Sequence, residues 1–377
     1  MELYANGQHA DVRALFRKTE NQELNELFKT IEDKIIFPSH LPQDQRKIVY
    51  NTSDPSRLEK NPIVIELEGV EFKFQTINRD KDLPRFAQLI DSVLRTAKTD
   101  ADWNNLPTLL AGLVKAGHKP RAGLHGKIIR VAIKNGQLHA ILECAKQAAE
   151  TGFYIQTREQ LTLIVQGISD MIDAAAGDVQ KIDKALKMAT AVHSVLLQSE
   201  HLKHKQAQRE GGSLQNSVLF RGLFVYGRAE LYKAKKAAEE SVEGDAVLLE
   251  DEIQTLAALW RRYSSTDIVD IPTFQQILPR TVYPELPYTS AYLNRHAYVT
   301  SLAQHIKAIE VVDGLCSANS EDFVSVSASV NDSLRPAVKK LDGHIGELLS
   351  RVKGEEQTQL ASHYSQIVGR ELNVSKS

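Results

Sequence analysis

The 377-residue sequence predicts a mainly α-helical protein, a solenoid of helical hairpins with a small β-hairpin near its N-terminal third. Three observations support this fold class. Apolar residues recur three and four positions apart over most of the chain from Leu83 onward. The breaks between these runs are short and contain Gly or Pro. Gly117 and Gly152 lie 35 residues apart, and each follows one apolar helix and precedes another. A unit of two such helices cannot bury its apolar face alone, so neighbouring units must stack.

Residues 1–61 are predicted to form an N-terminal helical arm, because apolar side chains over Ala10–Ile36 have the spacing of one or two amphipathic helices. Residues 62–82 are predicted to form a β-hairpin and a linker. The run Ile63–Phe74 is β-branched and aromatic, and Gly69 at its centre provides the turn.

Residues 83–200 are predicted to hold the helical repeats. Consecutive helices with short breaks between them should pack as antiparallel hairpins. A polar, basic stretch at Lys203–Gly212 predicts a loop after the last of them. The expected helices are Phe86–Ala97, Asn104–Ala116, Leu124–Lys134, Leu138–Thr151, Gln160–Ile172 and Ile182–Leu197.

Residues 213–377 are predicted to form a C-terminal helical region that is interrupted by a proline-rich connector at 270–290. Helical spacing covers Leu219–Tyr263 before the connector and Ala291–Glu371 after it. The alternating Val and Ser residues of Phe323–Val330 fit a strand or a helix, and the pattern does not decide between them.

The composition excludes several classes of protein. Lys and Arg number 46 against 48 Asp and Glu, so a wholly basic, histone-like nucleic-acid binder is excluded. Two distant cysteines encode neither a disulfide framework nor a zinc site, which favours a reducing compartment. No apolar run approaches the roughly 18 residues that cross a bilayer, so we expect no membrane insertion. The first twenty residues mix acids and bases, and match neither a signal peptide nor a clear transit peptide.

The residues around the 35-residue spacing resemble the pentatricopeptide repeat, a helix-turn-helix unit of about 35 residues. The resemblance rests on Lys134–Glu143 (Lys-Asn-Gly-Gln-Leu-His-Ala-Ile-Leu-Glu), Glu150–Gly152 and Leu161–Ile164. The unit Arg121–Ile155 matches best, the unit before it fairly and the unit after it weakly. Tetratricopeptide-like packing would give much the same pattern. The resemblance implies a mitochondrial protein with a role in ribosome association, RNA maturation or complex assembly, and the family typically binds single-stranded RNA.

This sequence departs from the repeat family at the base-reading positions. The alignment places Gly126 and Gln156 there in the best unit, and Leu161 in the next. Gly offers no side chain to a base edge, and Leu has neither a hydrogen-bond donor nor an acceptor. We therefore do not expect sequence-specific readout.

Forty consecutive residues between Asp102 and Glu143 contain no acidic residue. Three of the cations in this stretch lie at positions i, i+3 and i+7 and should share one helix face. Such a basic stripe suits a phosphate backbone. The alternative is a solvated face neutralised by acids from elsewhere, for which Glu239–Glu252 is the obvious candidate. The six predicted RNA-binding residues are Lys115, Lys119, Arg121, Lys127, Arg130 and Lys134.

No pattern in the sequence indicates catalysis, a metal or another cofactor. His201 and His204 have the spacing of a metal pair, but their setting is basic and has no nearby carboxylate. The zincin, nucleophile-elbow and phosphate-loop motifs do not occur. We therefore expect no enzymatic activity.

The prediction is thus a non-catalytic mitochondrial gene-expression protein, a mitoribosome subunit or a ribosome-associated or RNA-associated factor. It would contact the backbone of rRNA or mRNA and bind protein partners in a larger assembly. The main alternative is a protein-binding helical scaffold without nucleic-acid contact, such as a respiratory-complex assembly factor, and cytoplasm is the alternative location. An enzyme on an unfamiliar helical fold is the third option, and it would require a deep pocket lined by ionisable residues.

Overall fold

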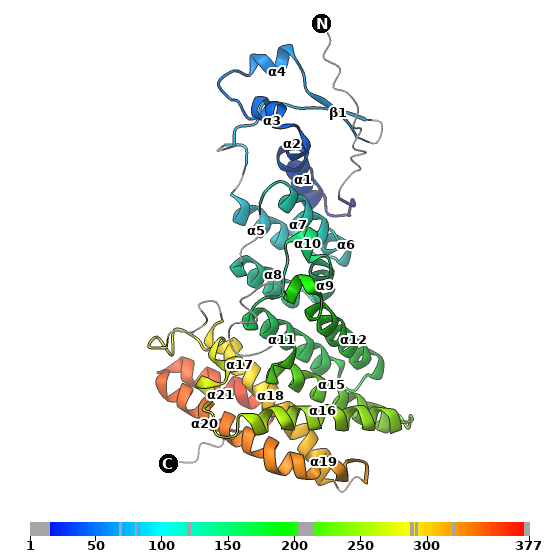
Figure 1. Ribbon diagram of the computed structural model, residues 1–377, viewed down its shortest axis with the longest axis vertical. Coiled ribbons are helices and arrows are strands. Elements are labelled where there is room, and N and C mark those ends of the chain that lie inside the picture. Colours follow the sequence, from blue (N-terminus) through cyan, green and yellow to red (C-terminus); the bar gives the residue numbers. More distant parts are fainter. Residues whose placement is uncertain are drawn as a thin grey trace. The chain divides into compact units, whose positions relative to one another are not determined.

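The computed structural model describes residues 16–67, 70–79, 81–83, 85–118, 122–202, 214–286, 290, 293–318 and 321–372. The described residues are mainly helical and contain one two-stranded sheet (Figure 1). This confirms the predicted fold class, while the stacking of hairpins into a solenoid stays a prediction. The chain forms two compact units, Met1–Phe153 and Tyr154–Ser377, which we call unit 1 and unit 2.

The first described helix of unit 1 is α1, which is capped by Asn21 and buries Leu24, Phe28 and Ile31. The side chain of Asn21 accepts a hydrogen bond from the backbone N–H of Leu24, and this satisfies one of the free donors at the helix start. Residues 10–15 of the predicted helical segment lie outside the described residues. The first elements are α1 (Gln22–Ile31), the π-helical turn η1 (Glu32–Ile36), α2 (Phe37–His40), α3 (Gln43–Val49) and α4 (Ser56–Lys60).

The predicted β-hairpin is present as β1 (Val64–Leu67) and β2 (Val70–Lys73), which pair antiparallel. Leu67 pairs with Val70, so two residues connect the strands. The predicted turn at Gly69 lies outside the described residues. A small apolar cluster joins the segments around the hairpin to α2 and α3, and its buried members are Phe37, Leu41, Val49, Phe74 and Ile77.

The rest of unit 1 consists of helices, which lie at the predicted places except for the short helix at Asp100–Trp103, which was not predicted. Gly117 and Gly152 follow the ends of α7 and α10 with φ of 89° and 65°, a backbone conformation that glycine adopts at little cost. The predicted helix Leu138–Thr151 is wrong in one respect, because it breaks at Gln147 into two helices. The elements are α5 (Phe86–Thr96), α6 (Asp100–Trp103), α7 (Leu106–Lys115), α8 (Ala122–Lys134), α9 (Leu138–Lys146) and α10 (Ala148–Thr151).

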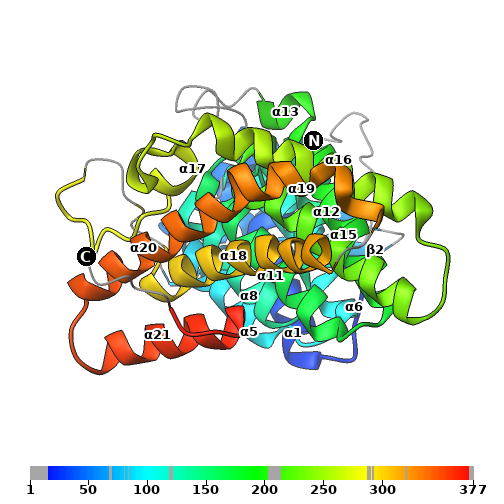
Figure 2. The ribbon, with the colours of Figure 1, turned by 90° about the horizontal axis from the view of Figure 1, so that it is seen from below.

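Unit 2 is assembled around α18, which contacts α11, α15, α20 and α21 (Figure 2). The ambiguous segment Phe323–Val330 is helical, and the predicted loop Lys203–Gly212 lies outside the described residues. The helices are α11 (Arg158–Ala175), α12 (Val179–Leu196), α13 (Ser199–Leu202), η2 (Leu214–Asn216), α15 (Val218–Ala237), α16 (Glu243–Arg262), η3 (Ile268–Asp270), α17 (Pro272–Gln275), α18 (Arg295–Ser317), η4 (Glu321–Phe323), α19 (Val324–Ser329), η5 (Val330–Leu334), α20 (Arg335–Arg351) and α21 (Glu355–Val368).

The proline-rich connector 270–290 contains the short helix α17 followed by turns. The backbone of Ser290 closes it, because its N–H donates to Leu278 O at 2.8 Å and its carbonyl accepts from Arg280 N at 3.1 Å. Prolines suit this segment because they cannot donate to a helix or a sheet.

Candidate nucleic-acid interface

Helix α8 has one buried face and one charged, exposed face. The exposed face carries Lys127, Arg130 and Lys134, at the predicted spacing of three and seven residues. The buried residues on the opposite side of the helix are His125, Ile128, Ile129 and Ala132. Burial of this apolar side fixes the rotation of the helix, so the three cations point away from the core of unit 1.

Lys127 is not a free cation. Its Nζ lies 2.6 Å from Oδ1 of Asp91, on α5, and the two side chains are 46% and 29% exposed. The stretch that contains no acidic residue therefore has an acidic side chain from another helix beside it. The sequence interpretation missed Asp91, because nothing in a pattern of spacings indicates which helix packs beside α8.

The acidic run Glu239–Glu252, the predicted source of neutralising acids, has partners on α15 instead. Asp245 Oδ2 lies 2.7 Å from Lys235 Nζ. Glu252 lies 3.7 Å from Arg221 and 3.9 Å from Arg228. These acids therefore neutralise cations of unit 2.

The other three predicted cations are not found on the exposed face of α8. Lys115 is exposed in the last turn of α7, and Lys119 and Arg121 lie outside the described residues. Lys115 is close enough to His40 on α2 to help lower the pKa of that imidazole, although burial of His40 is the larger cause. The structure thus groups three of the six cations on one face of α8 and places a fourth on the preceding helix, α7.

One histidine of the acid-free stretch, His125, adds little positive charge at neutral pH. His125 is buried against the ring of Phe153, with 4.5 Å between ring centroids, and this burial lowers the pKa of its imidazole to about 4. His139 Nε2 lies 3.3 Å from Oδ1 of Asn104. His125 therefore does not add to the charge that Lys127, Arg130 and Lys134 give to this helix.

Two of the three positions aligned with base readers present no polar group to a ligand. Gly126 is buried within α8, and the side chain of Leu161 on α11 is 2% exposed. Gln156 is half-buried. This arrangement suits contact with a phosphate backbone better than contact with base edges.

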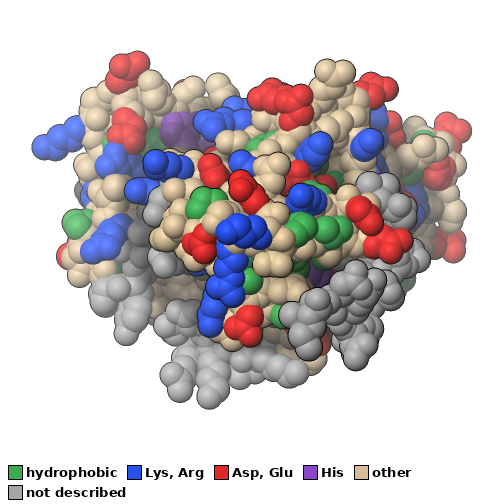
Figure 3. Space-filling view, turned by 90° about the horizontal axis from the view of Figure 1, so that it is seen from above, with side chains coloured by type: hydrophobic (Ala, Val, Ile, Leu, Met, Phe, Trp, Pro, Cys, Tyr) green, Lys and Arg blue, Asp and Glu red, His purple; other side chains and the backbone are tan. Residues whose placement is uncertain are grey.

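Positive charge on the molecule is local. On the face drawn in Figure 3, Lys and Arg side chains lie among Asp and Glu side chains. Any affinity for RNA must therefore come from particular cations and not from the net charge of −2.

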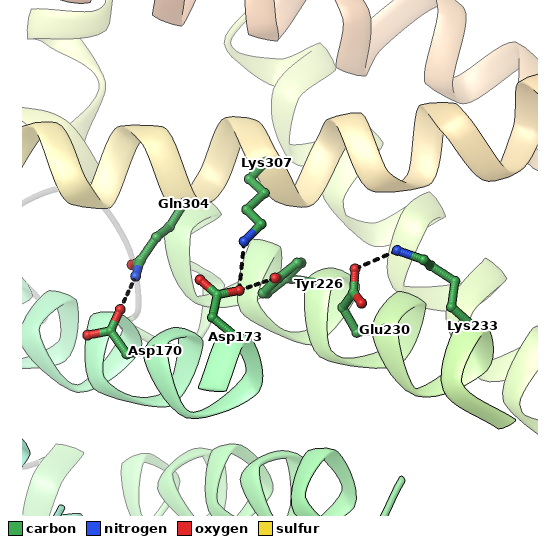
Figure 4. Close-up of polar contacts among 7 residues, drawn as sticks. All are labelled: Asp170, Asp173, Tyr226, Glu230, Lys233, Gln304 and Lys307. Carbon is green, nitrogen blue, oxygen red and sulfur yellow. Dashed lines mark hydrogen bonds and ion pairs between the residues drawn. The ribbon is translucent and has the colours of Figure 1, made fainter. Parts of the chain in front are cut away.

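Unit 2 contains a polar cluster that ties three helices together (Figure 4). Asp173 on α11 accepts a hydrogen bond from the hydroxyl of Tyr226 on α15 and lies 2.7 Å from Lys307 Nζ on α18. Gln304, one turn earlier on α18, donates to Asp170 at 2.8 Å. Burial, followed by the hydrogen bond and charge of Asp173, raises the pKa of Tyr226. Each of these groups has a partner within the cluster, so we assign the cluster a structural role.

Of the two histidines with the spacing of a metal pair, which the sequence did not favour as a site, the structure describes only His201. His201 is buried, and its Nδ1 accepts a hydrogen bond from the backbone N–H of Ile155 at 3.2 Å, while His204 lies outside the described residues. Among the residues that the structure describes, no group of three or more His, Cys, Asp and Glu side chains is arranged to hold a metal ion. Within the same residues, no helix is both long and apolar enough to cross a membrane.

Comparison with known proteins gives two matches. The family model described as "Mitochondrial ribosomal protein mS27" matches residues 4–367. The chain is also similar to the small ribosomal subunit protein mS27 of Neurospora crassa, with 28% identity over 229 residues. That alignment covers 61% of this chain and 58% of the length of the relative.

Proposed function

Because the chain belongs to the mitochondrial ribosomal protein mS27 family, we propose that it is a non-catalytic protein of the small subunit of the mitochondrial ribosome. The match of the family over residues 4–367 is the observation that carries this proposal. The family confirms the predicted mitochondrial location, and it agrees with the prediction that the chain is not an enzyme.

Within the ribosome, we propose that α8 contacts the phosphate backbone of rRNA. Lys127, Arg130 and Lys134 are exposed on one face of a helix whose other face is fixed in the core. Contacts of this kind hold a protein in position without reading sequence. The protein partners are the neighbouring proteins of the same subunit.

The finer resemblance to pentatricopeptide repeats is part of this proposal. It is supported by the contact between α8 and α9 across a short turn and by the 35-residue spacing of Gly117 and Gly152. Since Gly126 and Leu161 offer no group to a base, the repeats act as a rigid support for the cations.

Substitution of Lys127, Arg130 and Lys134 together by Ala tests the α8 contact. Loss of three phosphate contacts should reduce the slope of log affinity against log salt by about 2, and should weaken binding up to about 100-fold at 0.1 M salt. The effect should be equal for single-stranded RNAs of different sequence. Titration of fluorescently labelled RNAs measures both quantities.

The matched control replaces three other exposed cations of unit 1, Arg57, Lys60 and Lys98, by Ala. This variant should keep the affinity of the unchanged chain within about twofold, because it removes the same charge away from α8. Unchanged RNA affinity in the α8 variant would contradict the proposed contact and would favour the protein-binding scaffold. A loss that depends on RNA sequence would contradict backbone recognition.

A further inference from the structure

An open cavity of about 700 Å³ in unit 1 lies outside the predicted interface. Its wall comes from η1 and α2, from α3 and its end, from the segment between β2 and α5, from the start of α5 and from the residues that follow α7. The arginines and aromatic residues that line it are Arg46, Tyr50, Arg79, Arg85, Phe86 and His118.

The three arginines of this cavity have no acidic partner within the described part of the chain. Neither Asp nor Glu is among the described residues that line the cavity, and Arg46, Arg79 and Arg85 form no ion pair there. The carboxylate of Asp82 accepts a hydrogen bond from the backbone N–H of Asn78 at 2.7 Å. Gathering three like charges costs free energy, and an anion bound between them would offset that cost.

The cavity also holds its groups in place before any ligand binds. The guanidinium of Arg79 lies 4.1 Å above the ring of Tyr50, and the Tyr50 hydroxyl donates to the carbonyl of Lys34 at 3.3 Å. Phe86 and His118 stack with 5.6 Å between ring centroids and 9° between ring planes. Partial burial, followed by the positive charge of Arg79, lowers the pKa of His118, so this aromatic pair is largely uncharged at neutral pH.

We propose that this cavity binds one nucleotide of single-stranded RNA, with the phosphate on the three arginines and the base against the Phe86 and His118 pair. The planar guanidinium fork matches phosphate oxygens, and aromatic side chains stack on bases of any sequence. A volume of about 700 Å³ lies within the usual range for small-molecule sites. An acidic peptide would use the arginines but would gain little from the aromatic wall. The choice of RNA rests on the proposed function, whereas the anion site itself does not.

The double variant R46Q/R85Q tests the site and leaves Arg79 stacked on Tyr50. Loss of two phosphate contacts should weaken binding of a labelled single-stranded RNA about 25-fold at 0.1 M salt and should reduce the salt slope by about 1.4. The control R57Q/K60Q removes the same charge from α4, outside the cavity. The RNA affinity of this control should stay within about twofold of that of the unchanged chain. Equal losses in the two variants, or no loss in R46Q/R85Q, would overturn the proposal.

Competition experiments identify what the cavity recognises. Uridine monophosphate should displace the RNA at a lower concentration than inorganic phosphate, because only the nucleotide carries a base. Equal displacement by the two would overturn the base contact. Poly-glutamate that displaces the RNA as well as unlabelled RNA does, at equal charge, would overturn the choice of RNA.

Crosslinking tests the site without any substitution. RNA that contains 4-thiouridine should form adducts with the full chain at Tyr50, Phe86 or His118, identified by mass spectrometry. Adducts confined to residues 154–372 would overturn the proposal. The proposed function fails separately, if the unchanged chain does not sediment with the small mitoribosomal subunit. Sedimentation with that subunit, together with equal RNA affinity for R46Q/R85Q and R57Q/K60Q, would reject the cavity alone.

Discussion

At the scale of single residues, the ion pair between Lys127 and Asp91 reduces the charge that Lys127 offers to RNA. Both side chains are partly exposed, at 46% and 29%, so solvent screens the pair. Pairs of this kind contribute at most about 1 kcal/mol to stability. A phosphate that approaches Lys127 must nevertheless compete with the carboxylate, and this lowers the affinity of that contact.

Removal of the carboxylate should therefore strengthen RNA binding. We expect Asp91→Asn to raise the affinity up to about fivefold at 0.1 M salt, the contribution of one phosphate contact. The free energy of unfolding should change by less than about 1 kcal/mol. Glu59→Gln, on the exposed face of α4, is the control for loss of one negative charge and should have little effect. Lower affinity for Asp91→Asn than for this control would contradict the account.

Three buried histidines should make the protein sensitive to acid. Burial lowers the pKa of His125 and His344 to about 4 and that of His305 to about 3, below the usual value of 6.5. Below pH 6.5 the unfolded chain binds protons that the folded chain does not, so stability falls as the pH falls. Each histidine should cost about 2 kcal/mol between pH 7 and pH 5.

The two tryptophans allow the loss of stability between pH 7 and pH 5 to be measured for each unit. Trp103 lies in unit 1 with His125, and Trp260 lies in unit 2 with His305 and His344. Chemical unfolding followed in variants with one tryptophan each should show a loss in unit 2 about twice that in unit 1. Stabilities that stay constant between pH 7 and pH 5 would show that these imidazoles are not held neutral.

The sequence predicted charges and spacings at this scale but not partners. It identified Lys127, Arg130 and Lys134 as one face, because a helical period alone determines which side chains share a face. It did not identify Asp91, nor the cavity of Arg46, Arg79 and Arg85. These residues come from separate segments, and only the tertiary packing brings them together. Whether the α8 cations bind RNA stays a prediction.

At the scale of elements, the contact between α15 and α18 depends on a residue without a side chain. A methyl group added to Gly222 on α15 would lie 2.2 Å from Nδ1 of His305 on α18. The His305 ring is itself held by Trp260 of α16, whose Nε1 donates to Nε2 at 3.0 Å. The ring therefore has no freedom to move away, and three helices meet at this point.

Gly222→Ala should destabilise unit 2 by about 1–3 kcal/mol, because the methyl group overpacks this contact. This loss should exceed the gain of about 1 kcal/mol in helix propensity. Gly112→Ala on α7 is the control, since its methyl would meet the flexible end of Ile36, 2.6 Å away, which can turn aside. Urea unfolding measures the free energy of unfolding of both variants. A Gly222→Ala protein as stable as the unchanged chain would contradict this description of the contact.

Helical periodicity located the helices that were predicted between Phe86 and Leu197, but it missed the short helices α3, α4 and α6 and did not indicate local breaks in the backbone. The two helices within Leu138–Thr151 both bury apolar residues, so the pattern runs through the break at Gln147 unchanged. The Thr151 hydroxyl donates to the carbonyl of Cys144 at 2.7 Å and satisfies it across the break. In Phe323–Val330, small serines fit either period, and packing of α19 against α16 accompanies the helical form.

At the scale of the whole molecule, function could be predicted only through resemblance. A net charge of −2 and a mainly helical fold are compatible with many roles. The 35-residue spacing and the residues around it resemble the pentatricopeptide repeat, and this resemblance indicated a mitochondrial, ribosome-associated protein. The family match over residues 4–367 agrees. The partners depend on contacts between this chain and other chains, and the sequence of one chain does not show those contacts.

Sucrose-gradient sedimentation of a mitochondrial lysate, with and without ribonuclease, tests the central claim most directly. If the chain is a protein of the small mitoribosomal subunit, it should migrate with the rRNA of that subunit and leave those fractions after ribonuclease treatment. A chain found in a large complex that contains no rRNA and withstands ribonuclease would contradict the account.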